Sequence, residues 1–304
     1  MKKNGRKEWQ RIERRRNPGK GRFFLFSGLA LFFLAAVLIF WVLHEYGKSD
    51  KLYEQARASY VTGTLPEAEG YSAEEEAVPR AEKTAGWVPA MDADLEALSA
   101  EYPDVAGWIS FEDGEISYPI MYSGDNETYL YRSYNGESTK AGSIFLDGES
   151  NPGFSDLHTL IYGHNMRDLS MFGKLKYYAS DPGYYEKHPY FDIYTRDGAY
   201  RYRIFACEEV SSSAPVYYVY GTETEQYAGL LDWLMRNSCI DTGIDVTPSD
   251  HVVTLSTCTD SDENRMIVCG VRTEEYHNGN ESGKKAGIGS FDPGKAGGGG
   301  DKAD

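Results

Sequence analysis

Short apolar runs, several of them alternating with polar residues, fill the middle of the chain and predict β-strands. In the run at 199–207, Tyr200, Tyr202 and Ile204 alternate with Arg201 and Arg203. This alternation has the period of a strand with one buried face. Asp197-Gly198 separates two neighbouring runs and favours a tight hairpin. The predicted strands cover residues 106–111, 116–121, 142–147, 158–162, 190–195, 199–207, 251–257 and 265–272.

Helical spacing is rarer than strand spacing in this region. A short helix is expected in "MDADLEALSAEYPD", which offers an N-cap aspartate, two spaced leucines and a proline stop. Two further stretches, 170–179 and 224–237, also have apolar residues at helical intervals. Many short strands with few helices predict a closed or nearly closed β-barrel.

A different pattern lies near the N-terminus, where residues 23–43 ("FFLFSGLALFFLAAVLIFWVL") contain no charge. As a helix this segment is about 30 Å long, enough to cross a bilayer. A cleaved signal peptide has a shorter apolar region followed closely by a small-x-small site, and the nearest such triplet is at 56–58. We therefore predict an uncleaved transmembrane anchor.

The flanking charges predict the orientation of this anchor. Residues 1–22 contain ten lysines and arginines against two glutamates, so the positive-inside rule places them in the cytoplasm and the rest outside the cell membrane. Residues 44–90 have the composition of a stalk or linker, with one helical stretch near 51–60. The folded domain is expected at 91–277, and the glycine-rich tail at 278–304 is expected to be disordered.

Charge and cysteine spacing exclude several classes of function. The net charge is −16, which disfavours binding to nucleic acid. The four cysteines form no CxxC pair and no cluster with histidine, and the acidic run after Cys258 lacks the glycine and glutamate of an EF-hand. We therefore expect no metal and no cofactor. A disulfide between Cys207 and Cys239 is possible outside the cytoplasm, and the sequence leaves it open.

The stretch "VVTLSTCTDSDENRMIV" (252–268) suggests chemistry because a strand ends on a cysteine with polar neighbours. A lone cysteine is more often buried and inert, and a nucleophilic thiol needs a base. His251 begins the same strand and is too far from Cys258. His164 follows Gly163 at the end of an apolar run, which suits a residue at the rim of a barrel, whereas His158 begins that run.

Arg265 is the first residue of the strand that follows the acidic loop. If the two strands are neighbours, the loop returns Arg265 to the same rim as Cys258. A guanidinium there could stabilise an oxyanion and lower the pKa of the thiol. It could equally pair with Asp260, Asp262 or Glu263, and spacing alone leaves both interpretations open.

These residues resemble those of the sortases, membrane-anchored cysteine transpeptidases of Gram-positive bacteria. "TLSTC" is followed by an arginine seven residues later and preceded, roughly ninety residues earlier, by "IYGHNM". The stretches "VAGWISF", "ISYPIMYSGDNETYL", "GSIFLD" and "IYGHNMRDLSMFGKL" are similar to class B, and the resemblance covers roughly 92–273. It implies a closed eight-stranded barrel with an N-terminal helix and a further helix, at 224–237, between the sixth and seventh strands.

The resemblance also implies roles for individual residues. Cys258 would be the nucleophile, His164 the acid and base, and Arg265 the partner of the oxyanion. Asp260 matches a loop acid that would orient the histidine. The residues implied to lie beside the substrate are Leu130, Ser256, Thr257 and the backbone N–H of Thr259.

The reaction that the resemblance implies starts with cleavage of a secreted protein after the threonine of a C-terminal sorting motif, of NPxTN or xPxTG type. A thioester on Cys258 then passes the protein to an amine of a cell-wall precursor, such as lipid-linked peptidoglycan. Anchoring to the wall and assembly of pili are both open. Two alternatives are a hydrolytic cysteine endopeptidase, although papain-like enzymes place Cys before His in the chain, and a non-enzymatic surface protein that binds a partner.

Overall fold

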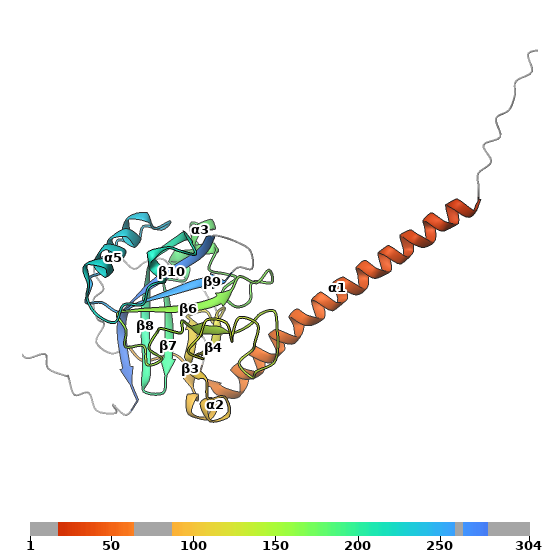
Figure 1. The fold of residues 1–304 in the computed structure, drawn as a ribbon. Helices are drawn as coiled ribbons and strands as arrows, with labels where there is room; N and C mark the ends of the chain where they lie inside the picture. The colour runs from red at the N-terminus through yellow and green to blue at the C-terminus, as the bar shows by residue number, and fades with distance from the viewer. Residues whose placement is uncertain (1–17, 64–86, 259–263, 279–304) are drawn as a thin grey trace, which may run out of the picture.

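The computed structural model describes residues 18–63, 87–258 and 264–278 (Figure 1). A long N-terminal helix leads to a barrel of short strands, with small helices in the connections. The elements in chain order are α1 (Pro18–Tyr60), β1 (Val61–Thr62), β2 (Asp92–Ala93), α2 (Leu95–Glu101), β3 (Val105–Phe111), β4 (Ser117–Met121), β5 (Ile144–Leu146), β6 (His158–His164), α3 (Tyr177–Ser180), α4 (Tyr184–Lys187), β7 (Tyr190–Thr195), β8 (Gly198–Ser211), η1 (Pro215–Tyr217), α5 (Glu225–Asn237), β9 (Val252–Cys258) and β10 (Asn264–His277).

Strands β3 to β10 close into a barrel in the order β10-β8-β7-β3-β4-β5-β6-β9. Two neighbouring pairs, β4–β5 and β6–β9, run parallel, and the other neighbours in the barrel run antiparallel. The eight-stranded barrel predicted from the sequence is confirmed. Two of the three helices expected in this region are also present: α2 precedes the barrel, and α5 connects its sixth and seventh strands, β8 and β9.

Burial alternates over residues 201–204 of the β7–β8 hairpin, as the sequence pattern predicts. Tyr202 and Ile204 are fully buried, whereas Arg201 is half-buried and bonds Asp192 across the pair through its Nε, at 2.9 Å. Gly198 has φ of +155°, and a Cβ there would overlap the main chain of Tyr276. The turn therefore requires glycine, as the Asp-Gly signal predicted.

The helix predicted over 170–179 is wrong for most of its length. Only α3, at its end, is helical, and the preceding residues form turns. Leu169 and Met171 have φ of 69° and 54°, and Met171 forms an isolated bridge with Asn165. The spaced apolar residues belong to a turn that folds back on β6, and backbone in this conformation cannot continue an α-helix.

The N-terminal helix extends beyond the predicted anchor. Residues 44–60, which the sequence assigns to the stalk, continue α1 without a break and pack on the barrel, where Tyr53 and Ala56 are buried. The side chains of its apolar half are largely exposed. A helix of this length and composition fits a membrane anchor or a signal sequence. Most of the predicted basic segment, about half of the predicted stalk (64–86) and nearly all of the predicted tail lie outside the described residues.

A disulfide joins Cys207 on β8 to Cys239, just after α5. The main-chain N–H of Cys239 also donates to the carbonyl of Cys207, at 2.7 Å. This bridge, which the sequence leaves open, fastens the C-terminal end of α5 to the barrel wall.

His158 links β6 to β9 and to the segment that follows η1. Its Nδ1 lies 2.9 Å from the carbonyl oxygen of Tyr218, which can only accept, so Nδ1 is the protonated nitrogen. In the neutral ring Nε2 then accepts from Thr254 Oγ1, also at 2.9 Å. Thr254 in turn lies 3.3 Å from the buried Cys269 thiol, whose pKa burial raises to about 12. His158 is therefore structural, and it is fully buried.

Acidification is expected to destabilise the barrel through His158. Burial lowers the pKa of this imidazole to about 4, whereas the unfolded chain binds the proton near pH 6.5. Its stabilising contribution is therefore complete above pH 6.5 and is lost as pH falls toward 4, by about 3 kcal/mol in total. Chemical denaturation of the detergent-solubilised chain between these pH values measures it. His158→Gln should flatten the dependence, and equal slopes in both proteins would contradict this assignment.

Candidate active site

His164 is the last residue of β6, with 6% of its surface exposed. Its Nε2 lies 2.6 Å from the main-chain oxygen of Leu130. Because a carbonyl oxygen only accepts, Nε2 carries a proton and donates it. In the neutral ring Nδ1 is then the nitrogen that carries no proton and can accept a hydrogen bond.

The surroundings of His164 hold its ring close to the barrel. The ring of Tyr131 lies 5.5 Å from that of His164, centroid to centroid, tilted by 37°. On the preceding residue, Gly163, a Cβ would overlap the side chains of Ile144 and Phe172. Only glycine lets β6 pass this close to its neighbours, which explains the glycine directly before the histidine.

Cys258 is the last residue of β9, and the parallel pairing of β6 with β9 brings it opposite His164. The register aligns Gly163 with Thr257 and His164 with Cys258. Neighbouring strands in a sheet lie about 4.8 Å apart, so the two backbones adjoin at the end of the barrel. The predicted nucleophile and the predicted base therefore lie on adjacent strands that end at the same level.

Arg265 is the second residue of β10 and lies at the same end of the barrel, as the loop pattern predicted. Its Nη1 donates to the carbonyl of Thr257, the residue before Cys258, at 3.4 Å. The hydroxyl of Thr257 accepts from the N–H of Met266 at 3.2 Å and so ties β9 to β10 beside this contact. The guanidinium thus adjoins the peptide that leads into Cys258. The acids considered as alternative partners, Asp260, Asp262 and Glu263, lie outside the described residues.

Of the other predicted substrate contacts, Ser256 and Leu130 lie among the described residues. Ser256 is fully buried, and its Oγ lies 3.0 Å from the Tyr217 hydroxyl. Leu130 adjoins the site through its carbonyl, as described above. Thr259 and Asp260 are outside the described residues, as is the side chain of Cys258.

The sequence alone missed a polar cluster beside Ser256. Tyr217 on η1 stacks on Tyr162 of β6, with ring centroids 6.4 Å apart. The hydroxyl of Tyr162 donates to Asp147 at 2.8 Å, and Asn126 Nδ2 donates to the same carboxylate at 2.8 Å. Asp147 ends the stretch "GSIFLD", so its position at a strand end was the available signal. No sequence pattern pointed to Tyr217.

Comparison with known proteins identifies the chain's relatives. The sortase domain model matches residues 115–273, just over half of the chain. The chain belongs to the sortase family. Sortase B of Listeria monocytogenes is 36% identical over 182 residues, which are 58% of this chain and 72% of the relative. The predicted resemblance to class B sortases is thus confirmed, and the chain is a cysteine transpeptidase of the sortase B type.

Solved sortase B structures have the same fold. Sortase B from Bacillus anthracis in complex with AAEK1 is 26% identical with a TM-score of 0.61, over 76% of this chain and 98% of that one. A substrate complex of Staphylococcus aureus sortase B is 27% identical with a TM-score of 0.56, over 59% and 84%. A sortase B complexed with triglycine is 27% identical with a TM-score of 0.55, over 59% and 85%.

Proposed function

We propose that this sortase cleaves a C-terminal sorting motif of NPxTN or xPxTG type after its threonine, with Cys258 as the nucleophile. The observation that supports this most is the register of β6 and β9, in which His164 is paired with Cys258. The contact of Arg265 with the Thr257 carbonyl supports it further, because it brings a fixed positive charge to the same end of the barrel.

In the proposed reaction the Cys258 sulfur attacks the threonine carbonyl, and Arg265 stabilises the oxyanion that forms. The carbon–nitrogen bond then breaks, His164 gives its proton to the leaving amine, and a thioester remains. An incoming amine attacks this thioester, passes a proton to His164 and expels the thiolate. The products are a new amide and the original enzyme.

The proposed acceptor is an amine of a cell-wall precursor such as lipid-linked peptidoglycan. The relative solved with triglycine supports an acceptor of peptide type. We further propose that residues 23–43 anchor the enzyme in the cell membrane with residues 1–22 in the cytoplasm. The basic N-terminal segment and the exposed apolar half of α1 support that orientation.

A ligation assay tests the proposed reaction. The detergent-solubilised chain is incubated with NPxTN and xPxTG peptides, with and without triglycine. The masses of the products and of the enzyme are then measured by mass spectrometry. We expect a peptide adduct on Cys258, a ligated product only when triglycine is present, and neither with Cys258→Ala. If the peptides are hydrolysed even when triglycine is present, the enzyme is an endopeptidase. If none of these peptides forms an adduct, the motif assignment is overturned.

A further inference from the structure

The membrane-distal part of α1 contacts the two segments that surround His164. Figure 1 shows α1 approaching the barrel from one side, with its end lying against the β4 region. Tyr53, on this part of the helix, is 2% exposed. Its hydroxyl and its ring make separate contacts, and each contact leads to His164 by a different path.

The first path starts at the hydroxyl of Tyr53. It donates to the carbonyl of Gly142 at 2.6 Å and lies 3.2 Å from Ser143 Oγ. Ser143 is bonded to the segment that carries Leu130: its N–H donates to the carbonyl of Tyr129 at 3.0 Å. The hydroxyl of Ser143 donates to the carbonyl of Arg132 in the same segment, at 2.8 Å. The carbonyl of Leu130, between these two bonds, accepts the proton of His164 Nε2.

Gly142 allows little adjustment on this path. Its φ is +58°, and a Cβ there would overlap the carbonyl oxygen of Leu130. The two backbones are therefore in close contact, so a displacement of Gly142 is transmitted to the acceptor of the histidine. A hydrogen bond from Tyr53 to Gly142 thus fixes the position of the Leu130 oxygen.

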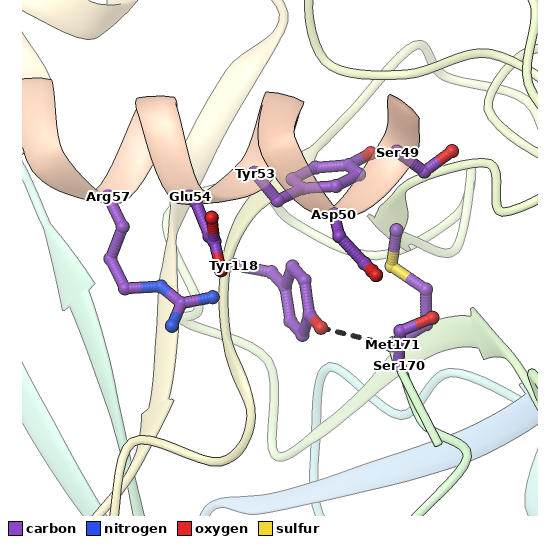
Figure 2. Close-up of a pocket in the computed structure, with 8 residues that line it drawn as sticks. All are labelled: Ser49, Asp50, Tyr53, Glu54, Arg57, Tyr118, Ser170 and Met171. Carbon is purple, nitrogen blue, oxygen red and sulfur yellow. Dashed lines mark hydrogen bonds between the residues drawn. The ribbon is translucent and has the colours of Figure 1, made fainter. Parts of the chain in front are cut away.

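The second path starts at the ring of Tyr53, which packs edge-on against Tyr118 of β4 with centroids 5.3 Å apart. Figure 2 shows Tyr53 on the helix and the Tyr118 ring below it, with a hydrogen bond joining the Tyr118 hydroxyl and Met171. The N–H of Met171 donates to that hydroxyl at 3.2 Å. The next residue, Phe172, donates its N–H to the carbonyl of His164 at 3.1 Å.

A partly open pocket separates α1 from this turn. A cavity of about 120 Å³ lies there, lined by Ser49, Asp50, Tyr53, Glu54, Arg57, Tyr118, Ser170 and Met171 (Figure 2). Met171 holds a left-handed conformation that costs free energy in a residue with a side chain. On the side of the turn that faces α1, the Tyr53–Tyr118 contact and the hydrogen bond from Met171 to Tyr118 connect the turn to the helix.

We propose that Tyr53 is a positioning residue for His164, through the Leu130 carbonyl on one side of the imidazole and the His164 backbone on the other. This inference rests on the proposed role of His164 as the acid and base. In this role α1 contributes to catalysis by fixing the position of His164. Tyr53 itself does not contact substrate in this role.

The test compares Tyr53→Phe with Tyr60→Phe in the full chain, solubilised in detergent, with the peptide that labels Cys258. Both changes remove one hydroxyl from the same helix, but Tyr60 donates to Glu101, away from His164, at 2.6 Å. We expect Tyr53→Phe to lower the rate of thioester formation about fivefold with KM unchanged, since one hydrogen bond is lost. Tyr60→Phe should match the unmodified chain.

The pH profile provides a readout that a purely structural role would not change. A displaced Leu130 carbonyl accepts less strongly from the imidazolium, so the limb controlled by the imidazole should move to lower pH in Tyr53→Phe. Tyr53→Leu removes the ring contact as well, so its rate should be lower than that of Tyr53→Phe.

The possible results separate this inference from the proposed function. If His164→Ala is inactive while both folded Tyr53 variants keep the rate and pH profile of the unmodified chain, the positioning role is overturned and the role of His164 stands. If His164→Ala is fully active, both are overturned. Thermal unfolding measurements identify a variant that fails to fold. If Tyr53→Leu does not fold, the rate and pH profile of Tyr53→Phe, which keeps the buried ring, decide whether Tyr53 positions His164.

Discussion

Replacement of His164 by alanine is expected to slow thioester formation by about three orders of magnitude. The leaving amine is then expelled without a positioned proton donor, and general acid–base catalysis contributes about 10²–10⁴ in rate. The change leaves the strand intact because His164 lies at the end of β6. Single-turnover measurements with the motif peptide, followed by mass spectrometry, give the rate directly.

His251→Ala is the matched control for this measurement. His251 directly precedes β9, at the end opposite Cys258, and its Nδ1 lies 2.8 Å from the carbonyl of Asp156. We expect this variant to form the thioester at a rate close to that of the unmodified chain. Equal losses in the two variants would mean that the His164 effect comes from damage to the fold and not from lost proton transfer.

Arg265→Ala is expected to lower the acylation rate by about 10²–10³, the effect of removing one group that stabilises an oxyanion. Arg265→Lys keeps the charge but loses the planar fork, so its activity should lie between those of the alanine variant and the unmodified chain. The loss should appear mainly in kcat, because the negative charge exists only in the transition state and the intermediate.

Arg236→Ala controls for the loss of a positive charge. Arg236 lies on the exposed side of α5 and pairs with Asp232 on the same helix. Surface pairs of this kind contribute little, so its removal should leave the acylation rate unchanged. A loss that appears only as a higher KM in Arg265→Ala would contradict the oxyanion role and indicate a role in peptide binding.

The barrel could be predicted because the chain contains many short apolar runs, some of them alternating, separated by turn residues. The β7–β8 hairpin followed from Asp197-Gly198, and α5 followed from a stripe of apolar residues. The turn after β6 was not predicted, because its apolar residues have helical spacing but its backbone turns left-handed at two positions. Spacing describes which residues are buried, and it does not exclude a non-helical path that buries the same residues.

The docking of α1 was missed for a different reason. The buried face of this helix is formed by Tyr46, Ser49, Tyr53, Ala56 and Tyr60, which follow a helical period of three and four residues. Charged residues between them, together with the small Ser49 and Ala56, make the segment resemble a linker in composition. The period was the available signal for a packed helix.

The backbone part of the site could not be read from the sequence at all. Leu130 was expected beside the substrate, and the structure shows that its carbonyl binds the imidazole of His164. Any residue has such a carbonyl, so side-chain type carries no information about this bond. The order of His164, Cys258 and Arg265 along the chain indicated one site through the resemblance to the sortases.

The parallel pairing of β6 with β9 has a consequence for how this protein matures. Parallel neighbours cannot be joined by a hairpin, so most of the barrel must be synthesised and folded before the two strands meet. In the unfolded chain Cys258 is therefore not held next to His164. The proposed active site is assembled only in the complete fold, which makes enzymatic turnover a sensitive assay of correct refolding.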